Sequence, residues 1–299
     1  MRALVIGEGL IGTALIERLR ALGHEVIGTT RRRNKVSKHL VHLDLDLESF
    51  ISTDLTEIDV AYFCAAMTKY DKCRDDEPMA RRINATNPAA IARSLVDSHA
   101  RVVLLSTSAV LDCRSPCMKE DRPRHPASVY GRTKAEAEVA FLDLGRMATV
   151  LRLTKVLIPG DERIGSWISK LARGEEFDCA GDFRISPIAL EHVVQALVSI
   201  SDQQEGGIFQ VSAASDISYA ELAWHIADQL HVSRQPARSR PSASLGIPSD
   251  TVTAYTSLDT ARLALISSFV PPDPQDVIDS VMGSVIAVAR NSTSVRAGT

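Results

Sequence analysis

The sequence lacks long hydrophobic runs and an excess of basic residues, and we expect no leader segment. Its apolar runs, such as those at 3–6 and 102–105, are far shorter than the ~20 residues that a membrane-spanning helix needs. The 34 lysines and arginines are balanced by 37 acidic residues, and the net charge of -3 does not favour nonspecific nucleic-acid binding. A strand-like segment begins at the N-terminus and leaves no room for a signal peptide. We therefore expect a cytoplasmic protein without a membrane or nucleic-acid partner.

The cysteines and histidines also lack the patterns of a disulfide framework or a metal site. The five cysteines are odd in number and form no C-x-x-C pair, which favours reduced thiols. The histidines do not have the spacing of metal ligands, so no metal is expected. At 299 residues the chain is long enough to form one or two hydrophobic cores that are stable without disulfides or a structural metal.

Apolar strand-like segments alternate with helix-spaced segments through the first half. Strands are expected at 3–7, 25–28, 41–45, 60–65, 101–106 and 149–154, and helices at 7–22, 88–98 and 128–142. Continuous apolar strands separated by helices are typical of a parallel sheet that is covered on both faces. The sequence therefore predicts an α/β fold with a Rossmann-type, doubly wound parallel sheet.

The alternation of strand-like and helix-like segments becomes less regular after about Pro159. Helices are expected at 164–173, 190–200 and 219–230, loops at 177–184 and 234–248, and a strand at 208–211 that returns to the first sheet. We predict a cofactor-binding domain at 1–158, a smaller α/β substrate-binding domain at 159–290 and a disordered tail at 291–299.

A G-x-G-x-x-G motif, formed by Gly7, Gly9 and Gly12, stands between the first strand and the first helix. In this context the first glycine allows a tight turn, the second allows a pyrophosphate to approach the backbone, and the third allows the helix to pack on the strand. The N–H groups at the start of the helix, with Leu10 and Ile11, would face the phosphates. The pattern predicts a dinucleotide site.

The end of the second strand favours NADP over NAD. An NAD site usually has an acidic residue there, which binds the ribose 2′-hydroxyl. This chain has Thr30, Arg31 and Arg32, which could bind a 2′-phosphate, although a solvated basic loop is the competing interpretation. Asp44 and Leu45 follow the third strand, where an acid could accept a hydrogen bond from adenine or simply lie in a turn.

Tyr130 and Lys134 form a Y-x-x-x-K pair on one face of a predicted helix. A nearby ammonium group would favour the phenolate and lower the pKa of the tyrosine. Thr107 ends an apolar strand, at the sheet edge where ligands of open parallel sheets bind. Together these residues predict a proton-transfer site, whereas each alone is common by chance.

The glycine loop, the strand ending Ser106-Thr107-Ser108 and the segment P-A-S-V-Y-G-R-T-K-A-E-A-E at 126–138 follow in that order. This set resembles the extended short-chain dehydrogenase/reductase family of nucleotide-sugar epimerases, dehydratases and reductases over nearly the whole chain. The resemblance implies a catalytic triad and further contacts. It makes Thr107, Tyr130 and Lys134 catalytic, places Ala65, Ala66, Asn84, Tyr130 and Lys134 at the cofactor, and places Thr107 and Ser108 at the substrate.

Segments of the second half indicate which members of this family the chain resembles. D-F-R-I-S-P-I at 182–188, G-I-F-Q-V-S at 207–212, S-Y-A-E-L-A at 218–223 and S-L-D at 257–259 resemble the substrate half of dTDP-4-dehydrorhamnose reductase-like proteins. Arg184 would then contact a substrate diphosphate, or form a surface salt bridge. Ser108 stands where dehydratases of the family carry an acid, which argues against dehydration and leaves the sugar open.

The resemblance and the motifs together predict an NADP-dependent oxidoreductase that reduces a keto group of a nucleotide-sugar-like substrate. Two alternatives remain open: a nucleotide-sugar 4-epimerase with tightly bound NAD, and a non-catalytic NADP-binding regulatory subunit. A homodimer is a further expectation.

Overall fold

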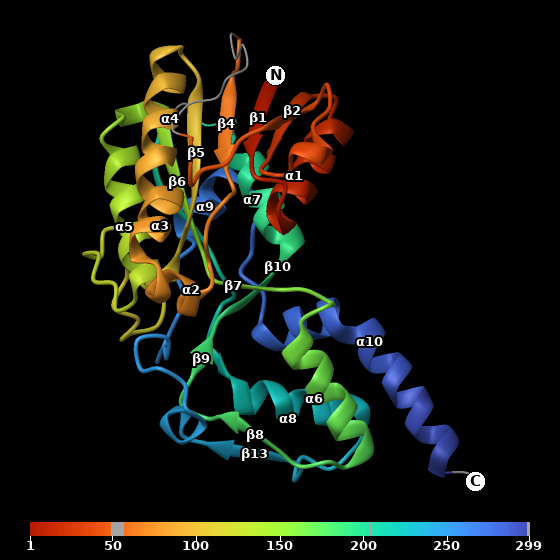
Figure 1. The fold of residues 1–299 in the computed structure, drawn as a ribbon. Coiled ribbons are helices and arrows are strands. Elements are labelled where there is room, and N and C mark those ends of the chain that lie inside the picture. The colour runs from red at the N-terminus through yellow and green to blue at the C-terminus, as the bar shows by residue number, and fades with distance from the viewer. Residues whose placement is uncertain (49–56, 202, 204, 298–299) are drawn as a thin grey trace.

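A seven-stranded sheet forms the centre of the upper part of the molecule in Figure 1. The computed structural model describes residues 1–48, 57–201, 203 and 205–297. The strands are β1 (Arg2–Ile6), β2 (Glu25–Thr30), β3 (Leu40–His42), β4 (Val60–Phe63), β5 (Arg101–Thr107), β6 (Ala148–Leu153) and β11 (Gly207–Val211). Their order is β11-β6-β5-β4-β1-β2-β3, and every neighbouring pair is parallel. This arrangement confirms the predicted Rossmann-type sheet.

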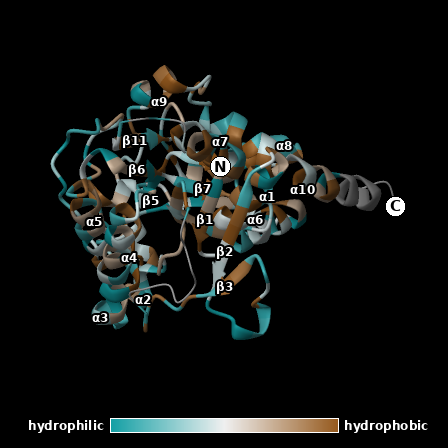
Figure 2. Cartoon of the chain, turned by 90° about the horizontal axis from the view of Figure 1, so that it is seen from above, coloured by the Kyte–Doolittle hydropathy of each residue, from teal (hydrophilic) through white to brown (hydrophobic). Residues whose placement is uncertain are grey.

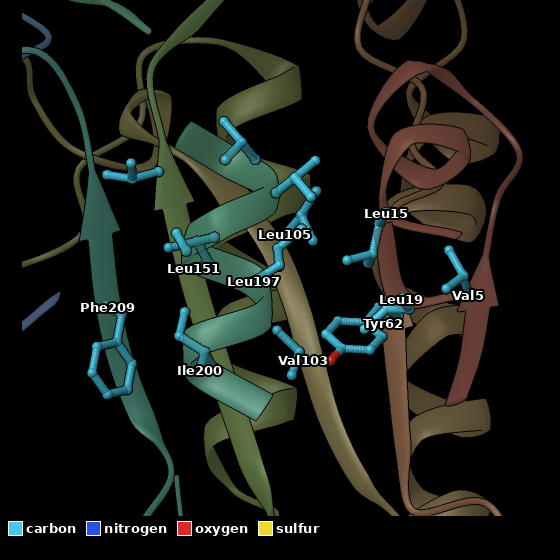
Figure 3. Close-up of a cluster of buried hydrophobic side chains, with 14 of the residues drawn as sticks. Val5, Leu15, Leu19, Tyr62, Val103, Leu105, Leu151, Leu197, Ile200 and Phe209 are labelled. Atoms are coloured by element: carbon cyan, nitrogen blue, oxygen red, sulfur yellow. The ribbon is translucent and has the colours of Figure 1, made fainter. Parts of the chain in front are cut away.

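Helices cover both faces of this sheet. Helices α1 (Leu10–Ala21) and α7 (Leu190–Ser201) lie on one face, and α4 (Asn87–Asp97) and α5 (Val129–Leu142) lie on the other. Figure 3 shows Leu15 and Leu19 of α1 and Leu197 of α7 directed at apolar side chains of the strands. Because both faces are buried, the strands are continuously apolar rather than alternating.

The sheet reverses its strand order between β1 and β4. From β1 the chain builds outward first through β2 and β3, and then on the other side through β4, β5 and β6. Ligands of open α/β sheets bind beyond the carboxyl ends of the strands at such a reversal. The glycine loop that follows β1 and the segment that follows β4 therefore lie where a ligand would bind.

A second apolar cluster lies below the sheet in Figure 1 and comes mostly from residues after Pro159. It contains the helices α6 (Glu162–Arg173), α8 (Tyr219–Leu230) and α10 (Pro274–Ala297), and the parallel pair β8 (Phe177–Ala180) and β13 (Ala237–Arg240). Smaller elements are β7 (Lys155–Leu157), β9 (Arg184–Ile185), β10 (Pro187–Ala189), β12 (Ile217–Ser218), α2 (Tyr70–Asp75), α3 (Glu77–Arg81) and α9 (Ala261–Ile266). The functional division near residue 158 remains a prediction, and β11 pairs with β6 in the first sheet.

Three local predictions are wrong. The strand expected at 41–45 ends at His42, because the chain turns at 44–47. The loops expected at 177–184 and 234–248 contain β8 and β13, which pair only with each other across a long stretch of sequence. The disordered tail expected at 291–299 is wrong for 291–297, which continue α10, while 298–299 lie outside the described residues.

The C-terminal helix α10 extends away from the rest of the molecule (Figure 2). Its earlier turns are anchored, because Val277, Ile278 and Met282 are buried against α6 and α8. This anchored part explains why a polar segment continues as a helix, since propagation costs less than nucleation. Among the described residues, no helix has the length and apolar character needed to cross a membrane.

Candidate active site

The glycine loop between β1 and α1 is shaped by its glycines as the motif predicts. Gly7 has a φ of 105°, and a Cβ atom there would lie 2.7 Å from the Cβ atom of Ala65. At Gly12 a Cβ atom would lie 1.9 Å from the carbonyl oxygen of Gly7, so only glycine allows α1 to start this close to the loop. A Cβ atom at Gly9 would meet nothing within 4 Å.

The open space at Gly9 adjoins the first turn of α1, where Leu10 is 49% exposed and Ile11 is half-buried. The first N–H groups of a helix have no partner within the helix and attract anions. Ala65 lies beside Gly7, and its N–H donates to the carbonyl of Ile6 at 2.8 Å, with Ala66 next in the chain. The loop, the helix start and the end of β4 therefore fit a bound pyrophosphate.

At the end of β2, the hydroxyl of Thr30 forms a hydrogen bond with Glu8, a residue outside the predicted site. Thr30 Oγ1 donates to Glu8 Oε1 at 2.6 Å and accepts from the N–H of Arg32 at 3.0 Å. Glu8 Oε2 lies 3.6 Å from Lys35 Nζ. The hydrogen bond from Thr30 is the main cause that lowers the pKa of Glu8, with Lys35 and Arg32 contributing. Arg31 and Arg32 are exposed.

Asp44 and Leu45 lie in a turn rather than at a strand end. The N–H of Asp46 donates to Asp44 Oδ1 at 3.1 Å, which closes the turn locally. The side chain of Leu45 is buried in the core, and its carbonyl accepts from Asn87 Nδ2 at 2.9 Å. A role of either residue at the adenine remains a prediction.

The carboxyl end of β5 meets the first turn of α5, and this contact brings Thr107 to Tyr130. The hydroxyl of Ser128 accepts from the N–H of Gly131 at 3.1 Å and caps α5. A Cβ atom at Gly131 would lie 2.3 Å from the carbonyl oxygen of Ala109, so glycine permits the close approach. The hydroxyl of Thr107 faces the phenol of Tyr130 closely enough to lower its pKa.

Tyr130 is protonated in this environment. Burial raises the pKa of Tyr130 to about 12, and the hydroxyl of Thr107 opposes this rise. Lys134 is not among the groups that shift this pKa, and a lowering by Lys134 together with the positive nicotinamide ring stays a prediction. The ring of Tyr70 lies 5.4 Å from that of Tyr130, between centroids. A neutral phenol is suited to donate a proton.

Lys134 lies one turn further along α5 and is 2% exposed. Burial lowers the pKa of Lys134 to about 8, and Glu138 on the next turn opposes this effect. Glu138 is fully buried and accepts from Arg152 at 2.8 and 2.9 Å, from Arg124 at 2.7 Å and from Ser106 at 2.6 Å. This ionic cluster ties α5 to β5 and β6 directly behind Thr107.

Asn84 fastens the segment after β4 to the same helix. It lies in a π-helical turn, Arg82–Thr86 (η2), a type of turn that is frequent at functional sites. Its amide accepts from the N–H of Met67 at 2.7 Å and donates to Thr133 at 3.0 Å. Thr133 in turn donates to the carbonyl of Tyr130 at 2.9 Å. These bonds position the segment and the helix, while a direct contact of Asn84 with a cofactor remains a prediction.

Ser108 and Arg184, the other two residues predicted to contact the substrate, lie in separate elements of the fold. Ser108 is buried at the start of a short 3₁₀ turn that follows β5. Arg184 forms an ion pair with Glu221 at 3.2 Å and donates to the carbonyl of Asp216 at 2.9 Å. The salt bridge considered for Arg184 is therefore present, and its contact with a substrate remains a prediction.

An ion pair between the two parts of the molecule was not anticipated. Arg74 of α2 donates to both carboxylate oxygens of Asp250 at 2.8 and 3.0 Å. The two residues are 176 positions apart in the chain, so no local pattern could have indicated the pair. Among the described residues, no group of three or more His, Cys, Asp or Glu side chains could hold a metal ion.

The fold and this site define an α/β protein with a dinucleotide-type glycine loop and a tyrosine–lysine helix beside it. The chain belongs to the family described as RmlD substrate binding domain, which it matches over residues 1–285. A relative from Streptomyces antibioticus, named as a probable dTDP-4,6-dihydroxy-2-methyloxan-3-one 4-ketoreductase, is 31% identical over 81% of each chain. These matches confirm the predicted relationship and the prediction of an enzyme of the reductase class.

Solved structures share the fold. The structure of MoeE5 in complex with UDP-glucuronic acid and NAD has a TM-score of 0.78 at 22% identity, covering 98% of this chain and 100% of the other. The dTDP-4-dehydrorhamnose reductase of Bacillus anthracis, in complex with NADP, has a TM-score of 0.75 at 18% identity, covering 95% and 99%. At these identities the likeness supports the Rossmann-like architecture.

Proposed function

We propose that this protein is an NADP-dependent reductase that converts a keto group of a nucleotide-sugar substrate to an alcohol. The observation that carries the proposal is the close packing of α5, with Tyr130 in its first turn, against the carboxyl end of β5, where Thr107 lies. The relative from Streptomyces antibioticus is named as a ketoreductase of a dTDP-sugar, and the Bacillus anthracis structure contains NADP. Both fit this site.

The bound nicotinamide would supply the hydride that reduces the carbonyl carbon. Gly7, Gly9 and the start of α1, with Leu10 and Ile11, would hold its pyrophosphate, and Lys134 would hold its ribose. Tyr130 donates its proton to the carbonyl oxygen as negative charge develops there, because its phenol is protonated at neutral pH. Thr107 donates a hydrogen bond to the same oxygen and orients it.

Lys134 acts through its charge. Its pKa of about 8 leaves most of the side chain protonated at neutral pH. The ammonium lies one helical turn from Tyr130 and would donate hydrogen bonds to the ribose hydroxyls of the cofactor. Glu138 opposes the effect of burial and so helps to keep that charge in place.

A turnover assay tests the proposal. The purified protein is mixed with NADPH and dTDP-4-keto-6-deoxyhexoses, and absorbance and product are followed together. We expect one NADPH oxidised for each keto sugar reduced. Epimerisation without net oxidation, or NADPH binding without turnover across a panel of keto sugars, would refute the reductase and support the epimerase or the regulatory subunit respectively.

A further inference from the structure

The acidic side chain at the end of β2 does not come from β2. In dinucleotide-binding folds an acid at this place accepts a hydrogen bond from the adenosine ribose, whereas NADP sites have cations there. The end of β2 itself is Thr30, followed by exposed arginines. The carboxylate of Glu8, from the glycine loop, lies against it, 2.6 Å from the threonine hydroxyl.

Several contacts hold Glu8 in this place. Its N–H donates to the carbonyl of Thr29 at 3.1 Å, which fixes the backbone of the loop against the strand. Thr30 is 2% exposed, and its hydroxyl donates to the carboxylate. Lys35, on the short 3₁₀ turn Arg33–Lys35 (η1), lies 3.6 Å from the second oxygen. The lowered pKa keeps Glu8 ionised at neutral pH.

The same groups are the ones that a 2′-phosphate would use. A phosphate needs hydrogen-bond donors and cations, and here these are the Thr30 hydroxyl, Lys35 and Arg32. The Glu8 carboxylate already accepts the hydrogen bond of the Thr30 hydroxyl and pairs with Lys35. A carboxylate and a phosphate cannot share one donor set without repulsion between like charges.

We propose that Glu8 sets the preference between phosphorylated and unphosphorylated dinucleotides, by occupying the donors that a 2′-phosphate requires. NADP(H) binds when the Glu8 side chain moves off Thr30 and Lys35, which then receive the phosphate. NAD(H) binds without this displacement, because a ribose hydroxyl can donate to the carboxylate in place. The inference rests on the proposed dinucleotide site but not on the reaction.

The geometry permits this exchange. The Glu8 side chain is 21% exposed and Lys35 46% exposed, so the pair lies at an open edge of the fold. The displaced carboxylate would be close to the exposed guanidinium groups that follow β2. Glu8 therefore reduces the affinity for NADP(H) without abolishing it.

Binding measurements on the full chain test the proposal without any turnover. Dissociation constants of NADPH and NADH are measured for the wild type and for Glu8→Gln, which keeps a hydrogen-bond acceptor for Thr30 and removes the charge. We expect Glu8→Gln to shift the ratio of the two constants about tenfold toward NADPH. Adenosine 2′,5′-bisphosphate and AMP, used as fragments, should show the same shift.

Two further variants make the result specific. Glu17→Gln removes an equal charge from an exposed position of α1, and its ratio should match the wild type. Lys35→Met in the Glu8→Gln background should lower the affinity for NADPH more than the affinity for NADH. An unchanged ratio in Glu8→Gln, or a shift toward NADH, would overturn the inference even if the reductase assay succeeds. A wild-type chain that binds neither nucleotide would overturn both proposals.

Discussion

The two ends of the proposed dinucleotide site are built on different physical principles. At the proposed catalytic end, Thr107 ends β5, and Tyr130 and Lys134 lie on the helix that docks on this strand, with a buried ionic cluster behind them. At the adenosine end, Glu8 and Lys35 form a partly exposed pair beside solvated arginines. From this comparison we expect the proposed chemistry to depend on packing, and the proposed cofactor preference to depend on charges that can be exchanged at small structural cost.

The largest expected effect is at the catalytic end. Tyr130→Phe removes the proton donor and leaves the ring, so kcat should fall by about 10²–10⁴-fold. The affinity for NADPH should stay as in the wild type, because the glycine loop is untouched, and fluorescence titration measures it. An unchanged kcat would show that Tyr130 does not supply the proton.

The next effect concerns the ionic cluster behind the site. Arg152→Met leaves Glu138 fully buried with one of its ion pairs removed, and breaking a buried pair costs about 3–5 kcal/mol of unfolding free energy. Urea unfolding measures the change. The control is Arg173→Met, which breaks a solvent-exposed pair with Glu175 and should change stability far less. Equal effects in the two variants would contradict the difference between buried and exposed charges.

Lys134 makes stability depend on pH. Its pKa is about 8 in the folded chain and about 10.5 when unfolded. Below pH 8 both states hold the proton, so the cost of burying the charge is at its maximum. Between pH 8 and 10 the folded state releases the proton and the unfolded state keeps it, so the contribution of Lys134 to unfolding free energy rises by at most about 1.4 kcal/mol per pH unit.

Comparison with Lys134→Met isolates this contribution from other titrating groups. The stability of the variant relative to the wild type should be highest at pH 7 and should fall by at most about 3 kcal/mol by pH 10. Urea unfolding at both pH values gives the difference. A relative stability that is constant with pH would mean that the folded pKa of Lys134 is ordinary.

The smallest effect is expected for the pair that links α2 to the second part of the chain. Arg74 and Asp250 are 42% and 30% exposed, so Asp250→Asn should lower the unfolding free energy by about 0.2–1 kcal/mol. Salt at 1 M should abolish the difference between variant and wild type. A larger, salt-independent loss would mean that the pair is buried in solution.

Local patterns in the sequence were sufficient to predict most of the first half. The glycine loop, α1 and the helix that carries Tyr130 depend on neighbours in sequence. The β8–β13 pair was missed because its two strands recognise each other across about sixty residues. The tail was mispredicted because its helix depends on turns that are anchored in the core.

What the sequence by itself determined is the alternation of strands and helices in the first half and the residue types at the proposed catalytic end, because periodicity and motif spacing are local properties. Only the tertiary structure decided which charges meet. It brought Glu8 to Thr30, Arg152 to Glu138 and Arg74 to Asp250, in each case from different elements. Composition showed a nearly neutral chain, but the electrostatics of both ends of the site depend on these pairings through space.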